Sequence, residues 1–257
     1  MAEDAGWDGI FVGDAFWCID PLIQLAACAM TTNHLRLGTM VLCTPLRIPR
    51  HLASESLAID HLSNGRLTLG LATGATWMGW KALPDETLDT KARAEMLDET
   101  IDVLTLMYQS KQFDFDGKHY HYQLSLVEEE HYPPKSVQQP RIPLWVPGIW
   151  PRMKNMKRAL KCDGVLPQKM DAEGKFIDLT PQDISEVKAY VTANRTLTTP
   201  FDIVVEGKAT HLPKAEQCGK VLPWVEAGAT WWIESLWGLT EEQTAVSIRQ
   251  GPPKIDY

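Results

Sequence analysis

The sequence predicts an α/β barrel in which parallel strands alternate with helices, and three observations support this prediction. Short apolar runs alternate with amphipathic helical segments along most of the 257 residues. Helix caps and Gly or Pro stops separate these segments. The length suits one barrel, and a hydrophobic content of 44% can fill its core. We therefore predict a single domain over residues 1–257, with an insertion at about 110–143.

The first half of the chain is predicted to contain three strands and three helices. Asp20 and Pro21 form a typical helix start, because Asp suits the N-cap and Pro is tolerated at the first helical position. Asn64–Gly65 supplies a left-handed stop for a helix that buries Leu62. The predicted strands are Gly9–Val12, Leu35–Leu42 and Leu67–Leu71, and the predicted helices begin at Pro21, cover about Pro49–Leu62 and pass through Leu97–Tyr108.

In the second half, the alternation of strands and helices is first interrupted and then continues. Alternating aromatics in Gln112–Tyr122, around Asp116–Gly117, predict a two-strand hairpin. Thr240 and Gln243 resemble a capping box, which predicts a closing helix. The remaining predicted strands are Leu144–Val146, Val165–Leu166, Ile203–Val205 and Trp231–Ile233, with helices opened by Pro151, Thr180 and Thr240 and one over Val221–Ala227. This gives about seven parallel strands, one fewer than a closed eight-stranded barrel needs.

Composition indicates which compartment and which classes of partner to expect. A formal net charge of −8 argues against a nucleic-acid partner, which would require a basic surface. Five cysteines without a CxxC pair indicate reduced thiols in a cytoplasmic protein. The first residues do not read as a signal peptide, and no apolar stretch is long enough to cross a bilayer. We expect a cytoplasmic protein that acts on a small molecule.

Several sequence blocks resemble the bacterial luciferase-like monooxygenase family. The most specific is Ala58–Arg66, which is similar to the family's A-x-L-D-x-L-S-x-G-R block. Thr31–Thr39, Phe115–Tyr120, Arg141–Val146 and Ala227–Trp231 are similar to other family segments. The resemblance implies a (β/α)8 TIM barrel of luciferase-like type, a homodimer and a flavin cofactor. That cofactor is FMN, with the deazaflavin coenzyme F420 as the alternative, and a partner reductase supplies it in reduced form.

The resemblance also bears on the start of the barrel. In the family, the first strand and most of the first helix precede the segment that matches Ala2–Gly9. The first strand is therefore expected to be missing from this chain, which would leave sheet edges exposed. Either the true start lies upstream, or a partner chain fills the gap, or the barrel does not close.

Barrel active sites lie at the carboxyl ends of the strands, so candidate residues can be read from strand ends. Asp14 and Glu234 are the candidate catalytic residues. Asp14 can equally cap the segment that follows it, and Glu234 can equally be a paired structural acid. Phe16, Trp77 and Gln168 are candidates for an apolar substrate pocket, although aromatic side chains are more often core. We predict no metal site, since His119 and His121 alternate on an exposed hairpin strand.

The candidate cofactor-binding residues follow three of the strands. The resemblance implies a bulge at Thr39–Val41, often with a non-prolyl cis peptide, that supports the flavin ring. The small residues of Ala72–Gly74 allow a flat ring to approach the backbone. A helix start after Gly148 offers free N–H groups to a phosphate, with Arg152 either adding a charge or lying in solvent. The complete set is Thr39, Met40, Val41, Ala72, Thr73, Gly74, Gly148, Ile149, Trp150 and Arg152.

Two departures from the family pattern affect the expected chemistry. Ala15 stands where members often have a histidine, and Ile149–Trp150 stands where many have small, serine-like residues. The leading hypothesis remains a flavin-dependent monooxygenase that acts on a small apolar organic substrate through an adduct of reduced flavin and oxygen. The alternatives are a deazaflavin-dependent hydride-transfer enzyme and a non-catalytic flavin-binding relative. A metal-dependent hydrolase ranks last.

Overall fold

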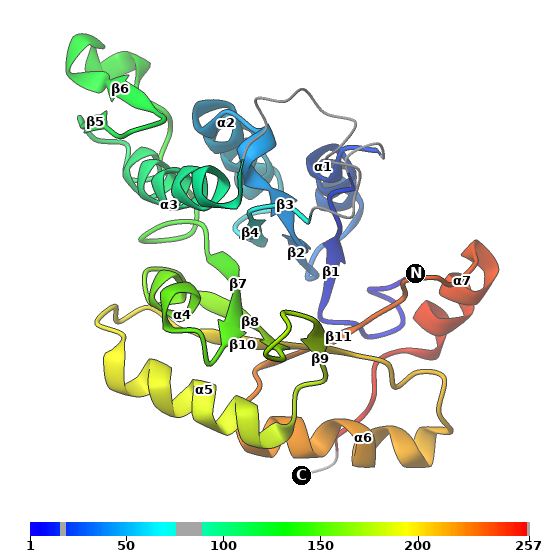
Figure 1. Ribbon diagram of the computed structural model, residues 1–257. Helices are drawn as coiled ribbons and strands as arrows, with labels where there is room; N and C mark the ends of the chain where they lie inside the picture. The colour runs from blue at the N-terminus through cyan, green and yellow to red at the C-terminus, as the bar shows by residue number, and fades with distance from the viewer. Residues whose placement is uncertain (16–18, 76–88, 256–257) are drawn as a thin grey trace. The chain divides into compact units, whose positions relative to one another are not determined.

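The structure is a computed structural model that describes residues 1–15, 19–75 and 89–255 (Figure 1). The chain divides into two compact units. We call Gly9–Leu144 the N-terminal unit, and residues 1–8 together with 145–257 the C-terminal unit. Each unit is described by itself.

The first four strands of the N-terminal unit run parallel to one another. β1 (Gly9–Val12) pairs with β2 (Arg36–Thr39), and β2 pairs with β4 (Leu67–Ala72). After a break at Met40–Val41, β3 (Leu42–Cys43) continues along β4 in the same direction. The predicted strand Leu35–Leu42 is therefore two short strands, because the backbone breaks between them.

Among the described residues of this unit, three helices each bury one face. They are α1 (Pro21–Thr31), α2 (Pro49–Leu62), which follows the 3-10 turn η1 (Thr44–Leu46), and α3 (Thr90–Met107). Asp20 caps α1 as predicted, and Asn64 and Gly65 have positive φ after α2. Leu62 was wrongly expected to be buried: it is 49% exposed, since the last turn of α2 presents it to solvent.

The predicted hairpin is present within 110–143. β5 (Asp114–Asp116) pairs antiparallel with β6 (His121–Gln123). The Glu99 carboxylate of α3 accepts hydrogen bonds from the backbone N–H groups of Lys118, His119 and Tyr120 at 2.9–3.0 Å. The hairpin turn is therefore fixed to α3. Two 3-10 turns follow, η5 (Leu124–Leu126) and η6 (Glu129–His131).

The C-terminal unit contains four parallel strands in the order β7 (Leu144–Trp150), β8 (Gly164–Met170), β10 (Asp202–Gly207) and β11 (Trp231–Glu234). β9 (Phe176–Ile177), which was not predicted, adds to β8 antiparallel. β7 and β8 extend well beyond the predicted Leu144–Val146 and Val165–Leu166. The β7–β8 pairing continues to Trp150 and Lys169, so tertiary pairing overrides the local breakers Pro147 and Gly148.

Four helices complete this unit: α4 (Met153–Ala159), α5 (Pro181–Asn194), α6 (Lys214–Ala227) and α7 (Glu241–Gln250). Capping boxes at Thr180 and Thr240 open α5 and α7, which confirms both predictions. α4 begins two residues after Pro151, because Trp150 stays extended before proline as part of β7. α6 begins earlier than the predicted Val221, since its first turns are polar.

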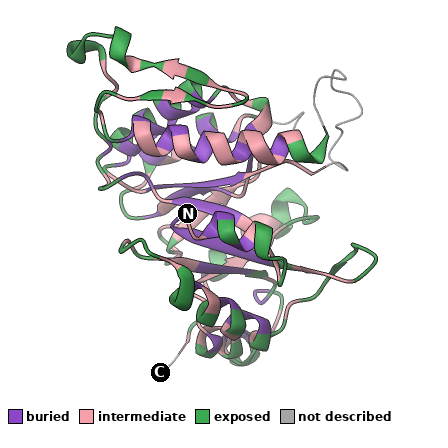
Figure 2. Cartoon of the chain, turned by 60° about the vertical axis from the view of Figure 1, so that its left-hand side comes forward, coloured by how far each residue is buried: buried purple, intermediate pink, exposed green. Residues whose placement is uncertain are grey.

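Figure 2 shows that buried residues are concentrated on the strands and on the inner faces of the helices, as an α/β fold requires. The exposed residues, coloured green, lie on helices and on the connections between elements. Within the described ranges, no helix has both the length and the hydropathy needed to cross a membrane.

Candidate functional site

A bulge separates β2 from β3 opposite β4. Leu37 and Gly38 pair with Leu67 and Thr68, whereas Leu42 and Cys43 pair with Leu71 and Ala72. The pairing therefore shifts by one residue, so Thr39–Val41 faces only two residues of β4, which is the definition of a bulge. The Met40–Val41 peptide bond is cis. Both features were expected from the family resemblance, and both are present.

Residues in the bulge after β2 and at the carboxyl end of β4 are partly exposed. Met40 and Val41 are intermediate in exposure between the buried Thr39 and Leu42. Ala72, Thr73 and Gly74 are likewise intermediate after the buried Leu71. Val41 packs against Gly70, where an added Cβ would lie 2.9 Å from its Cγ1. We call these five partly open residues (Met40, Val41, Ala72, Thr73 and Gly74) the strand-end patch.

Arg93 of α3 holds one edge of the strand-end patch. Its Nη1 donates to the carbonyl oxygens of Thr73 at 3.0 Å and Gly74 at 2.9 Å. The residue is only 4% exposed. Sequence reasoning missed this arginine, although an available signal existed: a cation near the N-terminus of a helix opposes the helix dipole and needs a specific partner.

Asp14 lies at the carboxyl end of β1 and is engaged in structural contacts. Its carboxylate accepts the backbone N–H of Cys43 at 3.0 Å and pairs with Arg47 at 3.2 Å. Arg47 also pairs with Asp20, the N-cap of α1, at 3.0 Å. These contacts give Asp14 a structural role that differs from the expected capping of the segment after it, and its catalytic role stays a prediction.

In the C-terminal unit, the predicted phosphate segment is mostly strand. Gly148, Ile149 and Trp150 belong to β7, and Trp150 Nε1 donates to Glu186 at 3.1 Å. The Arg152 N–H donates to the Ile149 carbonyl at 2.7 Å, so this amide is not available to an anion. The Arg152 side chain is exposed, and α4 has only seven residues. The expected helix-start phosphate site therefore receives little support from this geometry.

Glu234 ends β11 and is surrounded by donors. Its carboxylate accepts the backbone N–H groups of Ala209 and Thr210, the Thr210 hydroxyl and Trp232 Nε1, at 2.8–3.1 Å. The carboxylate thus fixes the connection that follows β10. This favours the structural interpretation, while a general acid–base role remains only a prediction.

The substrate-pocket candidates are placed less fully. Gln168 is exposed on β8, opposite Ile149 in the β7–β8 pairing. Phe16 and Trp77 lie outside the described residues. The structure therefore places neither of these aromatics relative to the strand-end patch.

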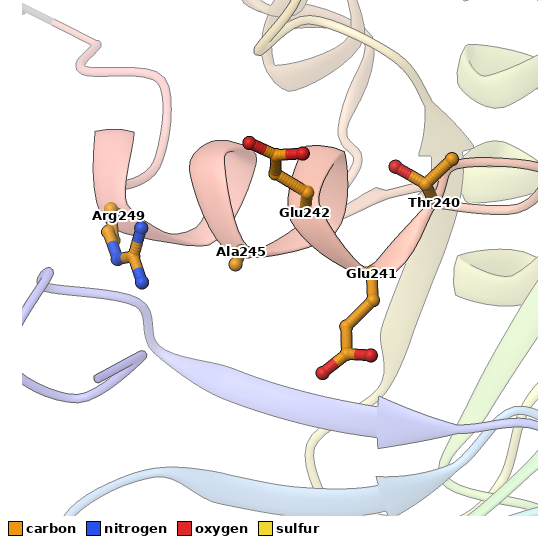
Figure 3. A pocket seen from close by; sticks show the side chains of 5 residues that line it. All are labelled: Thr240, Glu241, Glu242, Ala245 and Arg249. Atoms are coloured by element: carbon orange, nitrogen blue, oxygen red, sulfur yellow. The ribbon is translucent and has the colours of Figure 1, made fainter.

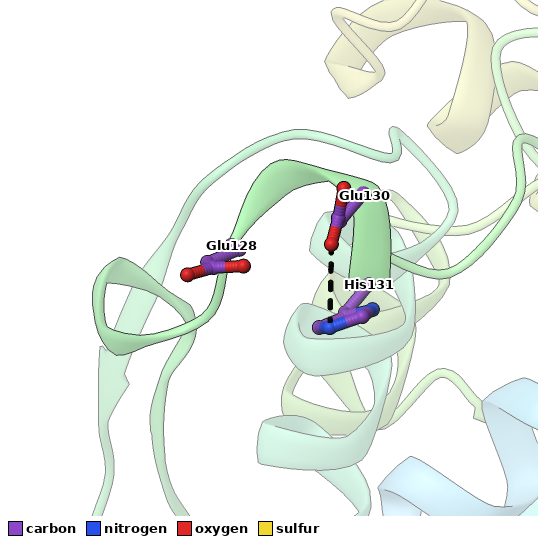
Figure 4. A group of neighbouring side chains, drawn as sticks. All are labelled: Glu128, Glu130 and His131. Carbon is purple, nitrogen blue, oxygen red and sulfur yellow. Dashed lines mark ion pairs between the residues drawn. The ribbon is translucent and has the colours of Figure 1, made fainter.

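Two further surface features contain none of the predicted site residues. A depression is lined by Thr240, Glu241, Glu242, Ala245 and Arg249 of the α7 region (Figure 3). Its acidic residues occupy the first turn of α7, where they complement the helix dipole. Glu128, Glu130 and His131 cluster near η6, all exposed, and Glu130 pairs with His131 at 3.7 Å (Figure 4). Solvent exposure and the Glu130–His131 pair are enough to stabilise the charges of this cluster.

These observations define the class as an α/β protein whose parallel strands present a small-residue surface at their carboxyl ends. The chain belongs to the luciferase-like monooxygenase family, whose sequence model matches residues 1–218. The chain is similar to the oxygenase component of the flavin-dependent trigonelline monooxygenase of Acinetobacter baylyi, with 28% identity over 127 residues. This match covers 49% of the chain and 33% of that protein. Across the first curated relatives, the matches span between 23% and 52% of the relative's length.

Two solved structures show the fold. The oxygenating constituent of 3,6-diketocamphane monooxygenase from Pseudomonas putida, determined with FMN, aligns with a TM-score of 0.63 at 16% identity, covering 86% of this chain and 63% of that one. The coenzyme F420-dependent tetrahydromethanopterin reductase from Methanopyrus kandleri aligns with a TM-score of 0.70 at 16% identity, covering 97% and 90%. The predicted luciferase-like barrel class is therefore confirmed.

The strand-end patch combines small side chains with partial exposure. A flat heterocycle needs an apolar surface without long side chains, and Ala72, Thr73 and Gly74 provide small side chains beside Val41. The carbonyl oxygens of Thr73 and Gly74 accept hydrogen bonds from Arg93, so their backbone is held in place.

Proposed function

We propose that this protein is a flavin-dependent monooxygenase that binds FMN and oxidises a small apolar organic substrate. The observation that carries the proposal is the strand-end patch, in which a bulge and a run of small residues open the ends of two neighbouring strands. Family membership supports the same class of chemistry. The name of the relative from Acinetobacter baylyi, an oxygenase component, supports a separate reductase as the source of reduced flavin.

The chain's own residues would have three tasks in this reaction. Met40 and Val41 would support one face of the ring, and Ala72–Gly74 would approach its edge through backbone groups. The apolar side chains of the patch would exclude water and accommodate an apolar substrate. The bound reduced flavin would carry out the chemistry with molecular oxygen.

FMN is preferred over the deazaflavin because no basic cluster suited to a longer anionic tail stands out in the sequence. The guanidinium of Arg93 is buried and bonded to backbone carbonyls. A short phosphate tail needs fewer cationic contacts than a longer anionic tail. Hydride transfer with F420 is the competing function, which the fold similarity to the Methanopyrus kandleri reductase favours.

The test is titration of the purified chain with oxidised FMN, reduced FMN and F420, followed by flavin fluorescence. We expect FMN to bind and F420 to bind at least about tenfold more weakly, a difference of about 1.4 kcal/mol. With NADH and a flavin reductase, wild-type protein should then consume oxygen in the presence of an oxidisable apolar substrate. Tighter binding of F420 would replace this proposal with hydride transfer, and binding of none of the three would remove both.

A pair of variants locates the binding surface. Ala72→Phe places a ring on the strand-end patch, whereas Ala27→Phe places the same ring on the exposed side of α1. We expect the first variant to lose FMN affinity and the second to retain it. Circular dichroism controls for folding. Equal affinity in both variants would place the flavin elsewhere.

A further inference from the structure

We infer that Arg93 is a positioning residue for the flavin site: it sets the backbone of Thr73 and Gly74 at the edge of the strand-end patch. This inference rests on the proposed function, because it assigns a role to a residue that lies behind the proposed flavin surface. Arg93 is on α3, and we do not propose that it contacts flavin or substrate.

The geometry is that of a clamp on two consecutive carbonyls. Nη1 of Arg93 reaches both the Thr73 and Gly74 oxygens, and Nη2 lies 3.4 Å from the Thr90 hydroxyl in the same helix. Gly74 has a φ of +79°, a conformation that side-chain-bearing residues rarely adopt. The chain therefore turns sharply where β4 ends, and the clamp holds both peptide units of the turn.

Energetic reasoning supports a specific role for the guanidinium. Burying a cation is costly unless its donors are satisfied, so a buried arginine this close to a strand end is retained only with strong partners. Hydrogen bonds from a charged donor are also stronger than neutral ones. A lysine keeps the charge but lacks the planar fork that reaches two acceptors together.

The chain offers a matched control in Arg195, which is the corresponding clamp in the C-terminal unit. Its side chain is 6% exposed and donates to the carbonyl oxygens of Cys162, Leu197 and Thr199. It also pairs with a carboxylate, that of Asp163, at 3.3 Å. Cys162 precedes β8, so this clamp acts at the amino end of a strand. Because barrel active sites lie at carboxyl ends, loss of Arg195 should affect stability and not flavin binding.

The experiment compares Arg93→Lys and Arg93→Met with Arg195→Lys and Arg195→Met. FMN affinity is measured by fluorescence titration, and stability by urea unfolding. Without flavin, hydrogen–deuterium exchange reports on the backbone of residues 70–75. We expect the Arg93 variants to bind FMN about tenfold more weakly, because the backbone of Thr73 and Gly74 is no longer held at the edge of the patch. They should also exchange faster at 73–75, while the Arg195 variants lose stability but keep wild-type affinity and exchange there.

Each result decides the inference. Unchanged exchange at 73–75 in both Arg93 variants would overturn it, as would equal losses of FMN affinity in the Arg93 and Arg195 variants. If Arg93→Met does not fold, Arg93→Lys decides alone. If wild-type protein binds no flavin, the proposed function fails. If the Arg93 variants still exchange faster at 73–75 in that case, Arg93 holds this backbone but does not serve a flavin site. That result also overturns the inference.

Discussion

The Thr39 hydroxyl and the Gly70 backbone form a closed pair of hydrogen bonds. Thr39 Oγ1 donates to the Gly70 carbonyl and accepts the Gly70 N–H, both at 2.9 Å. Both residues are buried. The pair lies where the bulge interrupts the ladder between β4 and its neighbours, so one side chain satisfies a backbone unit that the ladder leaves unpaired.

Thr39→Val should therefore lower the free energy of unfolding by about 1–3 kcal/mol, because it leaves buried backbone groups without partners. Thr39→Ser keeps the hydroxyl and removes one methyl group, so it should cost about 0.8 kcal/mol. Urea unfolding measures both. A serine variant as unstable as the valine variant would show that packing, and not the hydroxyl, matters at this position.

Gly70→Ala should be more damaging, since an added Cβ would lie 2.2 Å from the Thr39 carbonyl oxygen. We expect a loss of about 3 kcal/mol or more from this overpacking. Gly219→Ala in α6 is the control, because its Cβ would contact nothing within 4 Å. That variant should gain about 0.5–1 kcal/mol from helix propensity. Thermal unfolding of both variants checks the opposite signs.

Glu234→Gln should destabilise the protein by about 1–3 kcal/mol, because an amide cannot accept all the hydrogen bonds that the carboxylate accepts. Glu226→Gln, on the exposed side of α6, should change stability by less than about 0.5 kcal/mol. The measurement is thermal unfolding together with the pH profile of turnover. A Glu234→Gln variant with native stability and no turnover would instead assign acid–base work to Glu234.

The hairpin contact with α3 should weaken in acid. Hydrogen bonds from Lys118 and then from His119 lower the pKa of Glu95 to about 2. A lowered pKa in the folded state adds stability above the unfolded value, near 4.5, and this stability is lost as pH falls toward about 2. The stability difference between wild type and Glu95→Gln should therefore be constant above about pH 5 and shrink below it. Urea unfolding at a series of pH values tests this; a difference independent of pH would contradict it.

Cys43 should resist alkylation in the folded protein. Burial, and then the nearby Asp14 carboxylate, raise the pKa of its thiol to about 12, so almost no thiolate exists at pH 8. The partly exposed Cys218 should react with iodoacetamide under the same conditions. Peptide mapping by mass spectrometry distinguishes the two sites. Modification of Cys43 at the rate of Cys218 would show that the β3 region opens readily.

The sequence predicted those elements whose signals are local. The bounds of α2 follow from Pro49 at its start and Asn64–Gly65 at its end, and the capping box at Thr180 marks α5. The full lengths of β7 and β8 were missed, because they depend on pairing between distant segments. β9 was missed for the same reason.

Some parts of the candidate site could likewise be predicted from the sequence, and others could not. The bulge at Thr39–Val41 could be expected from the family resemblance, and the small residues after β4 from their composition. The partners of Arg93 and Arg47 could not be identified from the sequence, since they lie 19 to 33 residues away in the chain. Asp14 and Glu234 were selected by position at strand ends, but position alone does not show how many donors surround a carboxylate.

The Arg47 bridge has a practical consequence for redesign. One guanidinium fastens Asp14, where β1 ends, and Asp20, where α1 begins. Neither ion pair uses the side chain of Ala15, which stands where family members often have a histidine. Substituting Ala15 should therefore leave both anchors of this connection in place, so the position is open to redesign.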